Sequence, residues 1–180
     1  RSLVMMLAIV LLTAGTGAPQ DKTAGSSPKP DDESLKAAGL DPKPLTSAPL
    51  GLRMHAPLKA QVERDQRRGK PSLFISDAAN QTPAWTLRVL RVVTIKAQPS
   101  AADHMEKQIA KVQKAAGESF TMEVLSNESR QVGGRSGQLC YIEQAFKDGR
   151  TVVTGTLLVP SGKRIMLSFT VYTLRKDLNT

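Results

Sequence analysis

The stretch that decides the fold runs from Thr121 to Leu174 and reads TMEVLSNESRQVGGRSGQLCYIEQAFKDGRTVVTGTLLVPSGKRIMLSFTVYTL. It contains several runs of residues that favour strands, and every link between them contains glycine. Short glycine-containing links favour hairpins between neighbouring strands. The stretch therefore predicts an antiparallel meander, with runs at Thr121–Val132, Gln138–Phe146, Thr151–Val159 and Arg164–Leu174.

The last of these runs divides into two faces, because successive side chains of a strand alternate. One face is wholly apolar and predicts the core side: Ile165, Leu167, Phe169 and Val171. The other face is half polar, and we expect it to be a surface for a partner, since the sequence identifies no cover for it: Met166, Ser168, Thr170 and Tyr172.

A helix precedes the meander, at about residues 100–116. Ser100 is a suitable N-cap with Asp103 three residues later, a variant of the capping box. A single narrow stripe is formed by the apolar residues Met105, Ile109, Val112 and Ala116. Gly117 predicts that the helix ends at a glycine with a left-handed backbone conformation. Such a helix packs on a sheet, so the predicted fold class is α+β: an antiparallel meander with one helix on it.

Four further strands are expected before the helix. Leu52–Pro57 predicts a short edge strand because it stops at a proline, and Gln61–Arg64 and Pro71–Ser76 predict the next two. Ala84–Ile95 predicts a long strand whose alternation fails at Leu90–Val93, which indicates a bulge or burial of both faces.

The first 50 residues differ in composition from the rest. Arg1, the apolar run at 3–12 and the small residues that follow predict a signal peptide at 1–18, because spanning a bilayer takes about 20 apolar residues. The alternative for the apolar run is a buried core helix. Six prolines among small and polar residues predict a disordered linker at 19–50, with at most isolated helical turns around Glu33–Ala38. We therefore expect an exported protein, periplasmic or extracellular, with one domain at 51–180.

The net charge of +9 belongs to that domain, since residues 1–50 contain five basic and five acidic side chains. A basic surface favours anionic partners, although charge also simply maintains solubility. The densest basic cluster predicts an anion- or partner-binding loop: Arg64, Arg67, Arg68 and Lys70, extended by Arg88. The alternative is a solvated loop. Only Trp85 could stack bases nearby, which argues against nucleic acid, as does the signal.

Motifs for catalysis, metals and cofactors are missing from the sequence. Two histidines and one cysteine have no metal-ligand spacing, and we expect His55 and His104 to be surface residues. The segment at 134–137 (GRSG) resembles a nucleophile elbow only loosely, and we interpret its glycines as turn and bulge residues. Cys140 predicts a small buried hydrophobic side chain. We therefore expect no catalytic residue, no cofactor and no enzymatic activity.

The order of these segments over residues 51–174 resembles the PsbP-like and DcrB-like α/β/α sandwich family. The resemblance rests on a strand that ends at Pro57 and on the segments SLFISD (72–77), WTLRV (85–89), GGRSGQLCY (133–141), KDGR (147–150) and GKRIMLSFT (162–170). The family includes extrinsic photosystem proteins, periplasmic lipoproteins and protein-binding adaptors, so the resemblance implies a non-enzymatic binding module. Such domains usually end with a helix that covers the sheet, and this sequence stops where that helix would begin. We therefore expect either a truncated end or a sheet face left for a partner.

Together these observations predict an exported, non-enzymatic adaptor domain that binds a protein or another envelope component. The alternative is a module that binds an anionic small molecule or a lipid head group through the basic loop.

Overall fold

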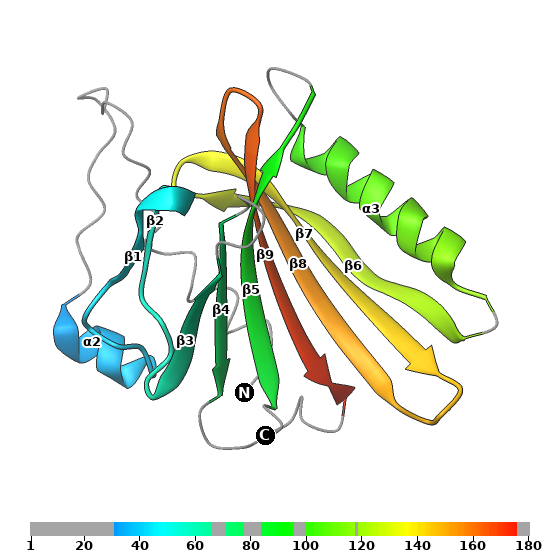
Figure 1. Cartoon of the computed structure of the whole chain (residues 1–180), viewed down its shortest axis with the longest axis horizontal. Coiled ribbons are helices and arrows are strands. Elements are labelled where there is room, and N and C mark those ends of the chain that lie inside the picture. Colours follow the sequence, from blue (N-terminus) through cyan, green and yellow to red (C-terminus); the bar gives the residue numbers. More distant parts are fainter. Residues whose placement is uncertain (1–30, 66–70, 78–83, 96–99, 118, 176–180) are drawn as a thin grey trace.

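The computed structural model describes residues 31–65, 71–77, 84–95, 100–117 and 119–175 (Figure 1). Seven strands form one antiparallel sheet in the order β3-β4-β5-β9-β8-β7-β6. This sheet, with one long helix on it, confirms the predicted α+β class. The strands are β3 (Ala60–Asp65), β4 (Ser72–Asp77), β5 (Trp85–Val93), β6 (Phe120–Val132), β7 (Arg135–Phe146), β8 (Thr151–Gly162) and β9 (Ile165–Leu174).

The predicted meander is confirmed as β6 to β9, with each strand paired to the next. Gly133 and Gly134 join β6 to β7 with φ angles of 55° and 75°, which suit a two-residue hairpin turn. Gly137 forms no bulge and pairs regularly with Arg130. Only glycine fits at position 137, because a Cβ there would lie 2.8 Å from the carbonyl oxygen of Leu158.

The long helix α3 (Ala101–Ala115) begins as predicted, with Oγ of Ser100 accepting a 3.2 Å hydrogen bond from the N–H of Asp103. Its buried Met105 packs with Cys140, Leu158 and Met166 on one face of the sheet. The predicted end was wrong: the chain leaves the helix in an extended conformation at Ala116, and Gly117 does not have a positive φ angle.

The opposite face is covered by a layer that the sequence assigned to the linker. Residues 31–50 contain α2 (Asp32–Ala37), β1 (Leu45–Ser47) and the 3-10 helix η2 (Ala48–Leu50). Leu50 is buried against the sheet in one cluster with Leu73 and Phe169. This part of the predicted linker is therefore folded, and the predicted signal peptide at 1–18 lies outside the described residues.

Two details of the early strands also differ from expectation. β2 (Leu52–Met54) pairs with β1 in a separate two-stranded sheet, so it is not an edge of the main sheet. β5 pairs with β9 without interruption from Trp85 to Val93, so the predicted bulge is absent. The alternation of apolar and polar residues fails at the end of this strand because one of its apolar residues, Val93, is exposed to solvent. Within the described residues, no helix is long and apolar enough to cross a membrane.

Candidate functional site

Helix α3 covers only part of its face of the sheet. It packs mainly on β6, β7 and β8 and also on Met166 of β9, whereas no described helix lies over the length of β3, β4 and β5 on that side (Figure 1). The strand register brings together two rows of side chains that run across this face from β3 to β8. We call these rows the open face: Gln61, Ser76, Thr86, Tyr172 and Thr154 in one, and Glu63, Phe74, Arg88, Thr170 and Thr156 in the other.

Arg88 is the most distinctive group of the open face. Its guanidinium carbon lies 5.2 Å from the centre of the Phe74 ring, a cation–π contact between neighbouring strands. Its Nε is buried, and no described atom accepts a hydrogen bond from it. A buried donor without an acceptor costs free energy. Arg88 therefore places on this face a buried donor that no described residue satisfies.

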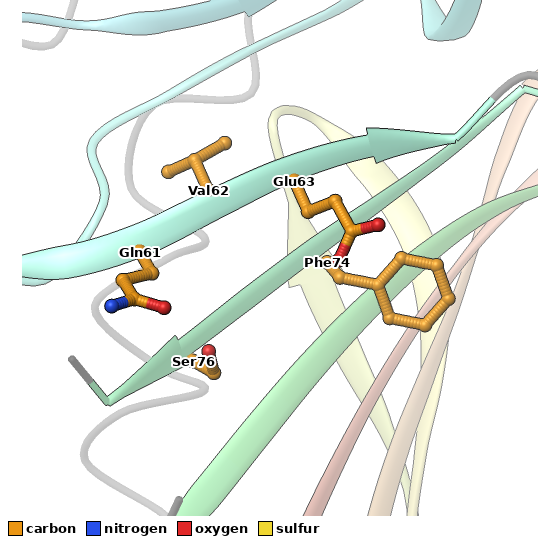
Figure 2. A pocket seen from close by; sticks show the side chains of 5 residues that line it. All are labelled: Gln61, Val62, Glu63, Phe74 and Ser76. Atoms are coloured by element: carbon orange, nitrogen blue, oxygen red, sulfur yellow. The ribbon is translucent and has the colours of Figure 1, made fainter. Parts of the chain in front are cut away.

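A hollow of 330 Å³ adjoins this pair at the edge of the sheet, and it is lined by Gln61, Val62, Glu63, Phe74 and Ser76. Figure 2 shows the side chains of Gln61, Glu63 and Phe74 on one side of the β3–β4 ribbon, with Val62 on the other. Phe74 both lines the hollow and contacts the Arg88 guanidinium, so the hollow and the guanidinium form one continuous surface.

Hydroxyl groups continue this surface towards the centre of the sheet. Oγ1 of Thr156 donates a long bond of 3.5 Å to Oγ1 of Thr170, which lies 3.4 Å from Oγ of Ser168. Oγ1 of Thr154 is buried without a partner among the described residues. The open face thus has unused hydrogen-bonding capacity at Arg88 and at Thr154, on either side of β9.

The predicted partner surface on β9 is only partly exposed. Met166 is 0% exposed because α3 packs on it, so the prediction that this face has no cover was wrong at this residue. Ser168 and Thr170 are also buried between neighbouring strands. Tyr172, which is 40% exposed, is the one of the four that reaches the surface, and it pairs with Thr86 and Thr154.

The predicted basic cluster is not brought together by the described part of the chain. Arg64 is opposite Leu73, and Leu73 is opposite Val89, so Arg64 points to the face away from Arg88. Arg67, Arg68 and Lys70 lie outside the described residues. Arg88 therefore belongs to the open face, and Arg64 does not.

The remaining candidate groups are separate from one another. Cys140 is fully buried, and burial raises the pKa of its thiol. Nδ1 of His55 lies 2.8 Å from the carbonyl oxygen of Asp41. Partial burial, and then Lys107, lower the pKa of His104. Among the described residues, no three His, Cys, Asp or Glu side chains are grouped so as to hold a metal ion.

The sequence did not identify Glu63, Phe74 or Gln61 as site residues. In the sequence, Phe74 lies in the run Leu73–Ile75 and is indistinguishable from a core residue. Its position beside Arg88 depends on the register in which β4 pairs with β5. The sequence that joins these strands, at 78–83, does not predict a turn of defined length, so it does not predict that register.

Comparisons with known proteins identify the fold. No protein-family model and no curated protein matches the sequence. The solution structure of cyanobacterial PsbP (CyanoP) from Synechocystis sp. PCC 6803 is similar, with a TM-score of 0.56 and 12% identity over 76% of this chain and 82% of that chain. Protein PA94 of Pseudomonas aeruginosa, a candidate regulator of unknown function, is similar with a TM-score of 0.50 and 12% identity, over 76% and 85% of the two chains. The fold is therefore PsbP-like, as the resemblance predicted.

Proposed function

We propose that this PsbP-like fold serves as a non-enzymatic binding domain that holds a protein partner of the cell envelope on its open face. The observation that carries the proposal is the half-buried Arg88 guanidinium, stacked on Phe74, with a buried Nε that lacks an acceptor among the described residues. Tyr172 is exposed one row away on the same face.

The chemistry of this surface supports binding of a protein segment with an acidic side chain. Arginine and aromatic residues dominate the binding energy of protein interfaces, and a guanidinium pairs with a carboxylate through two parallel hydrogen bonds. The hollow beside Phe74 can receive a neighbouring side chain. Neither histidine nor cysteine belongs to the open face, which favours binding over nucleophilic catalysis there.

The envelope location is proposed from the signal peptide that residues 1–18 predict. It is tested by fractionating cells that express the full chain and by sequencing the N-terminus of the accumulated protein. We expect the mature chain to begin near residue 18 and to be outside the cytoplasm. A cytoplasmic chain with residues 1–18 intact would contradict this part of the proposal.

The binding surface is tested by a photo-crosslinking amino acid at Tyr172, with the exposed Lys111 on α3 as the matched control position. We expect a discrete cross-linked protein at Tyr172 and none at Lys111. Affinity for that protein is then measured with Arg88→Met and, as a control for lost charge, with the exposed Arg150→Met.

Loss of the pair between Arg88 and a partner carboxylate should weaken binding at least about 30-fold, since truncating one partner of a buried charged pair costs about 2 kcal/mol or more. Arg150→Met should bind like the parent. Equal cross-linking at both positions, or unchanged affinity of Arg88→Met, would rule out the open face. If the double variant Arg67→Ala/Arg68→Ala instead abolishes binding in a salt-dependent way, the basic loop is the site.

A further inference from the structure

Two aliphatic side chains at one end of the sheet are far more exposed than any other large hydrophobic side chain that the structure describes. Val93, at the end of β5, is 72% exposed, and Ile95, two residues later, is 96% exposed. Isolated exposed aliphatic residues are ordinary. Here, however, they share the end of the sheet with three exposed basic residues, and we call this group the tip: Arg91, Val93, Ile95, Lys163 and Arg164.

The tip is one structural unit built from two segments. Val93 is paired with Ile165 across β5 and β9, and the N–H of Thr94 donates a 2.8 Å hydrogen bond to the carbonyl oxygen of Arg164. In Figure 1, the end of β5 and the β8–β9 hairpin project from the same end of the molecule, at the top of the view. The aliphatic pair and the hairpin turn therefore meet an approaching surface together.

Arg164 occupies a backbone conformation that is unfavourable for arginine. Lys163 and Arg164 form the two-residue turn between β8 and β9, and Arg164 has a φ angle of +81°, which glycine adopts without strain. A non-glycine residue in this conformation costs on the order of 1 kcal/mol, so Arg164 is kept at this turn at a cost in stability. The ion pairs between described residues do not include Arg91, Lys163 or Arg164, so their charges remain available.

We propose that the tip is the contact surface of this protein for an anionic lipid bilayer. Aliphatic side chains enter the boundary between head groups and acyl chains, while lysine and arginine extend to the lipid phosphates. Basic residues near such a membrane each contribute attraction, which the net charge of +9 reinforces.

A bilayer fits the tip better than a protein does. A stable protein interface buries about 800 Å² on each partner and is anchored by aromatic residues, whereas the tip offers two aliphatic side chains on a projecting end and contains no aromatic residue. The tip is also distinct from the open face: their nearest members on β5, Arg88 and Arg91, are three residues or roughly 10 Å apart and point to opposite faces of the sheet. Membrane contact thus leaves the open face accessible.

The test uses Ile95→Cys in the full chain, labelled with an environment-sensitive fluorophore. The only native cysteine, Cys140, is fully buried, so labelling is specific. Leu58→Cys and Leu125→Cys are matched controls, because both positions are exposed aliphatic residues away from the tip. This local readout is independent of any membrane binding by the apolar run at 3–12.

With phosphatidylglycerol vesicles, we expect a blue shift and quenching by spin-labelled lipid at position 95, and neither at positions 58 and 125. Phosphatidylcholine vesicles should give no shift. In the labelled chain, Lys163→Gln/Arg164→Gly should bind the anionic vesicles about 30-fold more weakly, while its melting temperature stays equal or rises. Lys107→Gln/Lys111→Gln, which removes the same charge from α3, should change binding little.

Three results would overturn the proposal. The first is an equal shift at all three labelled positions, which indicates unspecific attraction of a basic protein. The second is no shift at position 95 with anionic vesicles. The third is that the tip variants lose a protein partner while vesicle binding is unchanged, which would assign the tip to a protein interface.

Discussion

The two faces of the sheet differ in how completely they are covered, and their side chains differ accordingly. The face under β1, β2 and η2 is apolar from β4 to β7, and its buried members form one cluster that includes Leu73, Val89 and Phe169. The face under α3 is apolar beneath the helix and becomes mixed over β3, β4 and β5, where polar side chains alternate with Phe74 and Leu90. A covered face is thus selected for burial of apolar area, whereas a half-covered face can also present hydrogen-bonding groups to a partner.

The largest expected difference between the faces is on β9, where Phe169 and Tyr172 point to opposite sides. Phe169→Ala removes a fully buried ring from the covered face and should lower the free energy of unfolding by about 3–5 kcal/mol. Tyr172→Ala, on the open face, should change stability by about 0.5 kcal/mol or less. Urea unfolding of both variants measures this contrast, and similar losses would show that the open face is part of the core.

A smaller effect is expected where α3 covers its face. Met105→Ala leaves a cavity against Cys140, Leu158 and Met166, and should cost about 2–3 kcal/mol because the helix covers only part of the face. Lys111→Ala, on the outer side of the helix, is the matched control and should be neutral. A loss below about 0.5 kcal/mol for Met105→Ala would mean that α3 packs loosely.

Close packing within the covered face gives the third prediction. A Cβ at Gly155 would lie 2.7 Å from Cε1 of Tyr141 and 3.1 Å from Cγ1 of Val171. Because the surrounding side chains are buried, Gly155→Ala should destabilise the fold by about 1–2 kcal/mol. Thermal unfolding compares it with Gly117→Ala, where a Cβ meets nothing within 4 Å and little change is expected.

The smallest effect concerns the two tyrosines, which lie on opposite faces. Burial raises the pKa of the Tyr141 phenol above 10.0; the Glu128 carboxylate raises it further, and Arg130 lowers it. The folded state therefore favours the neutral phenol. The stability that the neutral Tyr141 phenol contributes is complete below pH 10 and is lost as the pH rises through the folded-state pKa of this group.

Tyr141→Phe should remove that part of the alkaline loss, as measured by urea unfolding at pH 8 and pH 11. It should leave stability at pH 8 nearly unchanged, because the buried hydroxyl has no hydrogen-bond partner among the described residues. Tyr172→Phe provides the control. An identical alkaline loss in Tyr141→Phe and the parent would contradict the assignment.

Some parts of this comparison could be predicted from the sequence. The four strands of the meander and the start of α3 at Ser100 were predicted to within a few residues, because alternation, short glycine turns and capping are local patterns. The burial of Leu50 was not predicted, because proline and serine surround it and its partners are Leu73 and Phe169, far along the chain.

The candidate site was predictable to a smaller extent. Tyr172 and Arg88 were both identified from the sequence, but as members of two unrelated surfaces. The pairing of β5 with β9 puts Arg88 opposite Thr170, and the pairing of β4 with β5 adds Phe74. Arg64 was grouped with Arg88 by charge alone, and the alternation of the strands puts them on opposite faces.

The sequence by itself determined the antiparallel meander, the amphipathic helix and the basic character of the domain, since each follows from interactions between residues close in the chain. Only the tertiary structure decided the strand order, the inclusion of residues 31–50 in the fold and the extent of the sheet that α3 covers. These depend on contacts between distant segments, whose free energy no local pattern encodes. The open face is a consequence of that last choice, because α3 packs on β6, β7, β8 and the Met166 end of β9, and no described helix lies over the rest of that face.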